Sequence, residues 1–155
     1  MNKKVLLEKD MEEFVLDSKK VGQIKYKESD LITLASPLFG FPDLHDFLLL
    51  EDDEYFPFLW FHSVEDPNVA FVVLPIKSYF NDYNPVIPKR ELKVLQAKDL
   101  NELTFFGIVV VPDNPKEATI NLRAPLVVNL GKKLAKQIIL DDDKYQIKTP
   151  LFEGD

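Results

Sequence analysis

The chain has 155 residues, of which 46% are apolar, and its 26 Asp and Glu against 19 Lys and Arg give a net charge of −7. This length is typical of one domain, and the 12 Phe can fill a hydrophobic core, which excludes a disordered chain. There is no Cys, which excludes disulfides, thiolate metal sites and a Cys nucleophile and fits a reducing cytoplasm. The N-terminus lacks the apolar stretch of a secretory signal, and no apolar run is long enough to span a membrane.

Short apolar runs separated by turn residues predict strands along most of the chain. We expect residues 1–10 to be a poorly defined N-terminal extension and residues 11–155 to form a single β-barrel domain. In the first third of the chain the pattern predicts strands over residues 13–16, 21–27, 31–34 and 47–51.

The stretch from residue 57 to residue 75 predicts a β-hairpin at the centre of the core. Two runs, 58–61 and 69–74, are rich in aromatic and β-branched residues and flank a connection that contains five residues of turn chemistry. Both runs are apolar on both faces, because strand side chains alternate and neither set is polar. A strand without a polar face is typically covered on both sides, which places this hairpin in the middle of the fold.

The second half adds one short helix and more strands. Pro88 suits the first turn of a helix over residues 89–96, and Gly107 permits a bulge in the strand that contains it. The remaining strands are predicted over residues 103–111, 118–123, 126–130 and 135–140. The fold class is therefore all-β and mainly antiparallel, a small closed or nearly closed β-barrel of about nine strands with one short helix, because closure removes exposed edges.

The loop over residues 35–43 carries large apolar side chains although it is irregular. Two Pro and Gly40 restrict its shape, and it presents Leu38, Phe39 and Phe41. Such a segment either plugs the end of the barrel or offers these side chains to a partner.

The acidic residues are concentrated in one part of the sequence. Between Lys27 and Lys77 there is no Lys or Arg. The same interval holds an acid block of ten residues, namely Glu28, Asp30, Asp43, Asp46, Glu51, Asp52, Asp53, Glu54, Glu65 and Asp66. A one-sign field of this kind disfavours direct nucleic-acid binding and attracts basic protein surfaces. The alternative is that these acids keep an aromatic-rich β protein dissolved and discourage edge pairing.

No catalytic apparatus is visible in the residue pattern. His62 follows Trp60 on the same side of its strand and is expected to be a structural core residue, while Ser63 points to the opposite face. The acidic runs lack the ligand spacing of a calcium loop, and no metal or cofactor site is expected. An alternative remains, a small-ligand-binding β-barrel or a hydrolase that uses a cavity near Trp60 and His62.

Five stretches carry a resemblance to a known family. They cover residues 39–43, 62–67, 121–129, 136–140 and 145–151, with Ser-Val-Glu-Asp-Pro and Asn-Leu-Arg-Ala-Pro as the most specific segments. In this collinear order, from about residue 12 to residue 152, the sequence resembles the flagellar assembly factor FliW family. The first ten residues and Phe39 depart from the family pattern.

The resemblance implies a cytoplasmic bacterial protein without enzyme activity that binds flagellin. It also implies that, when flagellin is absent, the protein binds CsrA, an RNA-binding translational repressor, and relieves its repression of flagellin synthesis. We expect a monomer when free, with no cofactor, no direct nucleic-acid contact and no membrane partner. A further alternative is a flagellin chaperone without a regulatory role.

Apolar anchors and acidic residues from the turns of the acid block are the candidates for partner binding. The predicted partner-binding residues are Phe39, Phe41, Asp43, Asp46, Glu65 and Asp66. Flagellin's terminal segments are expected to dock as amphipathic helices in an apolar groove, which the sequence does not locate.

Overall fold

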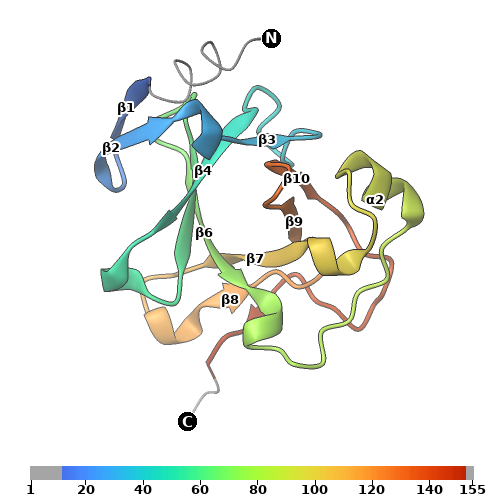
Figure 1. Ribbon diagram of the computed structural model, residues 1–155. Helices are drawn as coiled ribbons and strands as arrows, with labels where there is room; N and C mark the ends of the chain where they lie inside the picture. The colour runs from blue at the N-terminus through green and yellow to red at the C-terminus, as the bar shows by residue number, and fades with distance from the viewer. Residues whose placement is uncertain (1–11, 153–155) are drawn as a thin grey trace.

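The computed structural model describes residues 12–152 and has an all-β fold built around a closed barrel (Figure 1). Seven strands form the ring in the order β7-β6-β5-β4-β3-β10-β9, and pairing of β9 with β7 closes it. The barrel strands are β3 (Ile32–Leu34), β4 (Asp46–Glu51), β5 (Leu59–Ser63), β6 (Ala70–Pro75), β7 (Thr104–Val110), β9 (Leu126–Asn129) and β10 (Leu134–Gln137). Neighbours in the ring are antiparallel except β3 and β10, which are parallel. The predicted fold class is confirmed.

The remaining elements lie outside the ring. Strands β1 (Glu13–Ser18) and β2 (Gly22–Lys27) form a separate hairpin, and β8 (Thr119–Ile120) and β11 (Thr149–Pro150) extend the sheet beyond β7. The α-helix in the described part is α2 (Lys89–Val94). Single 3₁₀ turns are η1 (Glu28–Asp30), η2 (Asp53–Tyr55), η3 (Ile76–Ser78), η4 (Leu100–Glu102) and η5 (Pro115–Glu117). No helix among residues 12–152 combines the length and the apolar character that crossing a bilayer requires.

Each predicted strand overlaps an observed one. The strand expected over residues 135–140 is too long, since β10 ends at Gln137, and the one expected over residues 118–123 is also too long. Its ladder stops after Ile120. The side chain of Asn121 accepts hydrogen bonds from the N–H groups of Arg123 (3.1 Å) and Ala124 (2.9 Å). This local turn takes over the backbone donors that a longer strand would need. The short β11 has no counterpart among the predictions.

The barrel strands are apolar on both faces because each face packs into its own core. Each barrel strand contributes to the interior cluster, with Ile32, Phe47, Phe61, Val73, Phe106, Leu126 and Ala135. The neighbouring side chains Leu74, Phe105 and Val127 point outward into a second cluster that includes Ile87 and Leu95 at the ends of the α2 region. The prediction that the central hairpin is covered on both sides is confirmed for residues 61–63 of β5 and 73–74 of β6, which are buried. The other residues of these two strands are partly exposed.

Gly107 lies where β7 passes close to two isoleucines. A Cβ at this position would lie 2.4 Å from the Ile120 side chain and 3.2 Å from the Ile76 side chain. The ladder with β6 runs through Gly107 without interruption, since Leu74 pairs with Gly107 and Val73 with the next residue. The expected bulge is therefore wrong, and the glycine serves instead to give Ile120 room to pack.

The loop between β3 and β4 divides its apolar side chains between two directions. Leu38 is buried in the interior cluster, Phe41 packs against the same cluster, and the two are joined by an isolated bridge. Gly40 turns the chain between them with a φ of +88°, in the left-handed region that glycine adopts without strain. The predicted plug is confirmed for Leu38 and Phe41, whereas Phe39 points away from the barrel and is exposed.

Candidate functional site

Two turns of the acid block lie side by side at one end of the β4–β5 ladder. Phe47 at the start of β4 pairs with Ser63 at the end of β5, so the residues before β4 adjoin those after β5. The N–H of Val64 donates to the carbonyl of Asp46 across this junction (3.1 Å). The structure thereby brings together the four predicted acids, which we call the acidic turns, namely Asp43, Asp46, Glu65 and Asp66.

Glu65 acts as a clamp between the acidic turns. Its Oε1 accepts hydrogen bonds from the backbone N–H groups of His45 and Asp46, the latter at 2.8 Å. Hydrogen bonds from backbone N–H groups to a carboxylate are stronger than those between neutral groups. Glu65 therefore has a structural role that its place in a run of charge did not reveal.

Two of the other acids are also engaged in local hydrogen bonds. Asp46 Oδ1 accepts from the Thr33 hydroxyl (2.7 Å), which joins β4 to β3. Asp66 Oδ1 accepts from the N–H of Asn68 (2.9 Å), which shapes the turn after β5. Asp43 is exposed, and within residues 12–152 its carboxylate has no hydrogen-bond partner. Asp43 is thus the member of the acidic turns whose charge is least committed to the fold.

The charge of the acid block is not cancelled by ion pairs inside the described part of the chain. The ion pairs between residues 12 and 152 are Arg123–Asp143, Lys136–Glu91 and Lys144–Asp142. None of them includes an acid of the block. One basic residue from the first hairpin does come near, because the N–H of Lys19 donates to the carbonyl of Pro67 beside the acidic turns (2.9 Å).

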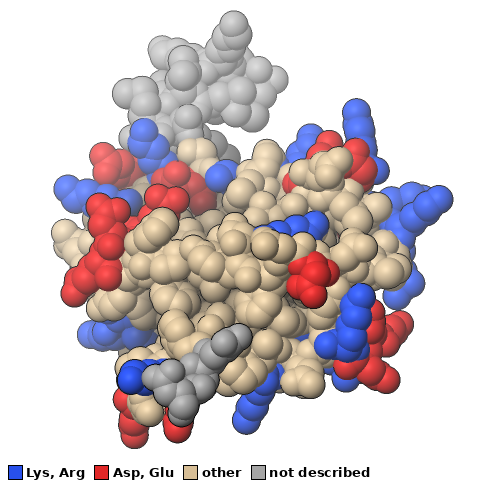
Figure 2. Space-filling view, turned by 90° about the horizontal axis from the view of Figure 1, so that it is seen from below, with Lys and Arg blue, Asp and Glu red and all other residues tan. Residues whose placement is uncertain are grey.

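The charges are arranged differently on the face near β8, η3 and the described C-terminal end. Figure 2 shows this face, which is mostly uncharged at its centre, with Lys and Arg interspersed with Asp and Glu around its margin. Mixed signs of this kind give no large field of one sign. A steering field would therefore come from another part of the surface.

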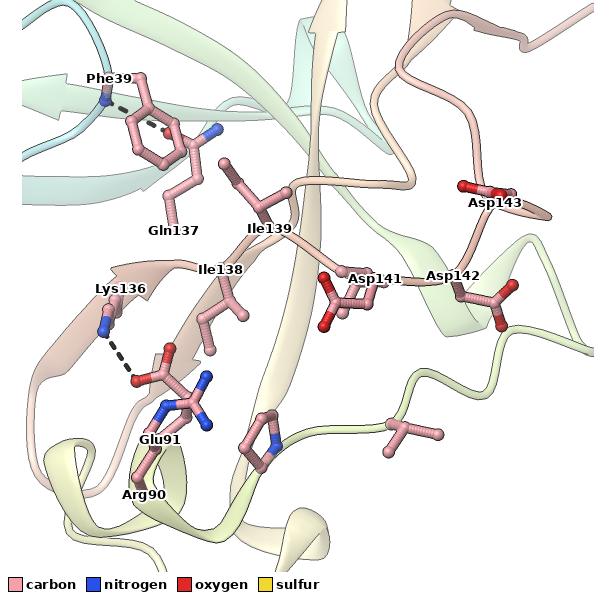
Figure 3. Close-up of a pocket in the computed structure, with 13 residues that line it drawn as sticks. Phe39, Arg90, Glu91, Lys136, Gln137, Ile138, Ile139, Asp141, Asp142 and Asp143 are labelled. Atoms are coloured by element: carbon pink, nitrogen blue, oxygen red, sulfur yellow. Dashed lines mark hydrogen bonds and ion pairs between the residues drawn. The ribbon is translucent and has the colours of Figure 1, made fainter.

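A second region of interest is a groove that Phe39 helps to form, shown in Figure 3. It has a volume of about 770 Å³ and lies along the segment that follows β10. Three of its apolar side chains are unusually exposed, with Phe39 at 58%, Val86 at 84% and Ile139 at 59%. We call it the Phe39 groove; its lining residues are Phe39, Val86, Pro88, Arg90, Glu91, Lys136, Gln137, Ile138, Ile139, Leu140, Asp141, Asp142 and Asp143.

The charged groups of the Phe39 groove sit at its two ends. At one end Lys136 Nζ donates to Glu91 Oε1 (2.7 Å), and at the other end lies the run of acids from 141 to 143 (Figure 3). The N–H of Phe39 reaches the side-chain oxygen of Gln137 (3.5 Å), which ties the loop to β10. An apolar middle with charged ends is suited to a peptide segment rather than to a small polar metabolite.

Phe41 does not join Phe39 in this groove. Its ring packs edge-on against Phe71 with the centroids 5.2 Å apart, and it is half-buried in the barrel end. Of the two predicted anchors, the structure therefore leaves Phe39 available and uses Phe41 for the core.

Ile139 is a groove residue that was not predicted from the sequence. Ile138 and Leu140 are buried in the second cluster, outside the barrel, while Ile139 between them is exposed. The signal was present, since strand alternation forces the middle of three consecutive apolar residues toward the opposite face from its neighbours.

His62 is enclosed as a structural residue. It is fully buried, its Nδ1 lies 2.7 Å from the carbonyl oxygen of Ser63, and its Nε2 is hydrogen-bonded to the Ser18 hydroxyl. Because a carbonyl only accepts, Nδ1 carries a proton, and in the neutral imidazole Nε2 then accepts from the Ser18 hydroxyl. Ser18 also accepts from the N–H groups of Lys20 (2.9 Å) and Val21 (3.0 Å), so the pair fastens the β1–β2 hairpin over β5.

The alternative of a cavity shared by Trp60 and His62 is not supported by this geometry. A hollow of about 400 Å³ lies at Trp60, lined otherwise by Lys20, Tyr55, Phe58, Leu59, Val72 and Val111, and His62 takes no part in it. Within residues 12–152 no three His, Cys, Asp or Glu side chains gather in a way that suits a metal ion.

A tyrosine pair supports the chain just past the acidic end of the Phe39 groove. The rings of Tyr83 and Tyr145 lie 4.7 Å apart, and the Tyr83 hydroxyl donates to the carbonyl of Leu122 (2.8 Å). Burial, and then the neighbouring Tyr145, raise the pKa of Tyr83 above its ordinary value. Tyr145, and then Asp142, raise the pKa of the exposed Lys144 ammonium.

A seven-stranded ring with a loop that plugs one end and two adjoining acidic turns is the arrangement to set beside known proteins. A family model described as FliW protein matches residues 15–151. The chain belongs to the FliW family. The resemblance seen in the sequence is thereby confirmed, and residues 1–11 lie outside both the match and the described structure.

Relatives and a solved structure agree with this membership. The flagellar assembly factor FliW of Caldanaerobacter subterraneus subsp. tengcongensis is 40% identical over 139 residues, which cover 89% of this chain and 93% of that protein. That of Bdellovibrio bacteriovorus is 34% identical over 138 residues, which cover 89% of this chain and 79% of that protein. A crystal structure of the flagellar assembly factor FliW matches with a TM-score of 0.85 at 31% identity, and covers 91% of this FliW-family chain and 99% of that chain.

Proposed function

We propose that this protein is a cytoplasmic flagellar assembly factor that binds flagellin and, when flagellin is absent, binds CsrA and relieves its repression of flagellin synthesis. The observation that carries the proposal is the FliW family match over residues 15–151. The free protein is a monomer in this proposal, and it performs no catalytic step.

Two surface features support a role in protein binding. The Phe39 groove exposes apolar side chains from three separate segments, as partner-binding surfaces do. The acid block has no ion pair within residues 12–152, so its charge is available to attract a basic partner. An RNA-binding repressor is a partner of that kind, because it must carry cationic groups for phosphate.

Co-purification tests the central claim. The tagged protein is isolated from its own cells, with the flagellin gene intact or deleted. We expect flagellin on the protein in the first case and CsrA in the second. CsrA that never appears once flagellin is absent would leave only the flagellin chaperone, and neither partner in either strain would refute the proposal.

Charge reversal at Asp43 tests steering of CsrA without disturbing the fold. Asp43→Lys should lower the association rate about fivefold at low salt, because a change of two charge units is worth about 1 kcal/mol against one charge about 8 Å away in water. The matched control Asp113→Lys changes the net charge equally on a distant exposed loop and should leave the rate nearly unchanged. Wild-type binding should weaken when salt is raised to about 0.5 M. Equal rates for both variants, or no salt dependence, would remove the acidic turns from CsrA capture.

A further inference from the structure

The backbone along the Phe39 groove has an unpaired edge. The carbonyl of Ala135 in β10 accepts from the N–H of Ala35, just past the end of β3 (2.7 Å). Beyond this bond the chain after β3 enters the loop between β3 and β4, while the chain after β10 continues toward Asp141. The position beside residues 137–141 where β3 would have continued is therefore not filled by a strand.

The hydrogen bonds of residues 138–140 show which backbone groups face the position that β3 leaves open. The N–H of Ile138 donates to the carbonyl of Pro125 (3.1 Å), and that of Leu140 donates to the carbonyl of Arg123 (2.8 Å). Successive backbone groups of a strand face opposite sides, so the N–H and C=O of Ile139 face away from these partners. Within residues 12–152 no backbone or side-chain group bonds to either of them.

We propose that the edge at Ile139 is a strand-addition site, on which an extended segment of flagellin pairs beside residues 137–141. The inference rests on the proposed function and names the binding mode. The unpaired N–H and C=O of Ile139 can be satisfied by another extended chain, whereas a helix has already used its own N–H and C=O groups internally. This replaces the expected docking of flagellin as an amphipathic helix.

The side chains around this edge define the segment that fits. Exposed Phe39 and Ile139 offer apolar contacts at one end of the vacated position (Figure 3). Asp141 lies at the other end, and within residues 12–152 its carboxylate has no ion-pair partner, unlike Asp142 and Asp143. The occupant is therefore an extended peptide with apolar side chains at alternate positions and a Lys or Arg near Asp141.

Amide hydrogen exchange read by NMR tests the pairing directly, on the full chain with monomeric flagellin encoded in the same genome. In the free protein the Ile138 and Leu140 amides should exchange slowly and the Ile139 amide fast. Saturating flagellin should slow exchange at Ile139 by at least about tenfold, because its N–H gains an acceptor. Flagellin that binds without slowing Ile139, as a docked helix would, overturns the inference.

A proline substitution gives a second readout. Ile139→Pro removes an N–H that bonds nothing within residues 12–152 and should weaken flagellin binding about tenfold, whereas the matched Ile139→Val keeps the donor and should bind nearly as the wild type. Equal binding by a folded Ile139→Pro overturns the inference, and if this variant fails to fold, the exchange experiment decides. Wild-type protein that binds no flagellin would instead refute the proposed function itself.

Discussion

The acidic turns and the Phe39 groove differ in how far their polar groups are already committed to the fold. In the acidic turns, Glu65 bonds two backbone N–H groups and Asp46 bonds Thr33. In the groove, the N–H and C=O of Ile139 bond to no group within residues 12–152, and the side chain of Phe39 is exposed. A charged residue in a turn can thus serve the fold, while an ordinary isoleucine is left free for the partner binding that we propose. Hydrogen-bond satisfaction separates the two roles better than residue type does.

The largest effect is expected from a change that damages the scaffold under both regions. Gly107→Val places methyl groups where Ile120 and Ile76 already lie, so it should lower the free energy of unfolding by about 3 kcal/mol. Urea denaturation measures this. The control Gly131→Ala, whose Cβ would meet only Asn129 at 3.6 Å, should change it by less than about 0.5 kcal/mol. Similar stabilities for both variants would mean that the barrel relaxes around Gly107.

A paired comparison of Glu65 and Ile139 sharpens the contrast between the regions. Glu65→Ala should cost about 1–2 kcal/mol of unfolding free energy, because the N–H groups of His45 and Asp46 lose a charged acceptor. Ile139→Ala should cost less than about 0.5 kcal/mol, because the side chain is mostly exposed. Thermal and urea unfolding measure both. The milder Glu65→Gln keeps an acceptor oxygen and should lie between them, and a larger loss for Ile139→Ala would reverse the assignment of roles.

The smallest effect concerns pH at the tyrosine pair beside the groove. Because the pKa of Tyr83 is raised in the folded protein, the unfolded chain releases this proton first as pH rises above about 10. Stability should therefore fall with rising pH from about 10 upward, by about 1 kcal/mol per pH unit at this residue. Denaturation at pH 9, 10 and 11, compared between wild type and Tyr83→Phe, isolates the effect. Parallel pH profiles for the two proteins would contradict it.

Most of the fold was predictable from local patterns. Alternation and turn residues located the strands, and Pro88 located α2. The strand over 118–123 was predicted too long, because the side chain of Asn121 captures the backbone donors that follow it. Within the nine-stranded sheet, seven strands close the ring and β8 and β11 extend it, while β1 and β2 form a separate hairpin; which strands close the ring was not predictable from local patterns.

The candidate site was only partly predictable. The acidic turns adjoin because β4 and β5 pair as neighbours in the chain, which a hairpin pattern can anticipate. The Phe39 groove unites residues near 39, 86–91 and 136–143, which no local pattern connects. Phe39 and Phe41 were both predicted as anchors from the same loop, but only Phe39 lines the groove, since Phe41 packs against Phe71.

From the amino-acid sequence alone follow the all-β class, the two-sided apolar strands, the one-sign acid block and the likeness to a family, because each depends on residues close together in the chain. The tertiary structure decided which acids hold turns together, which aromatic rings remain outside, and where a strand edge lies open. Those outcomes depend on which distant segments meet as the barrel closes, and closure is set by packing of the whole core at once.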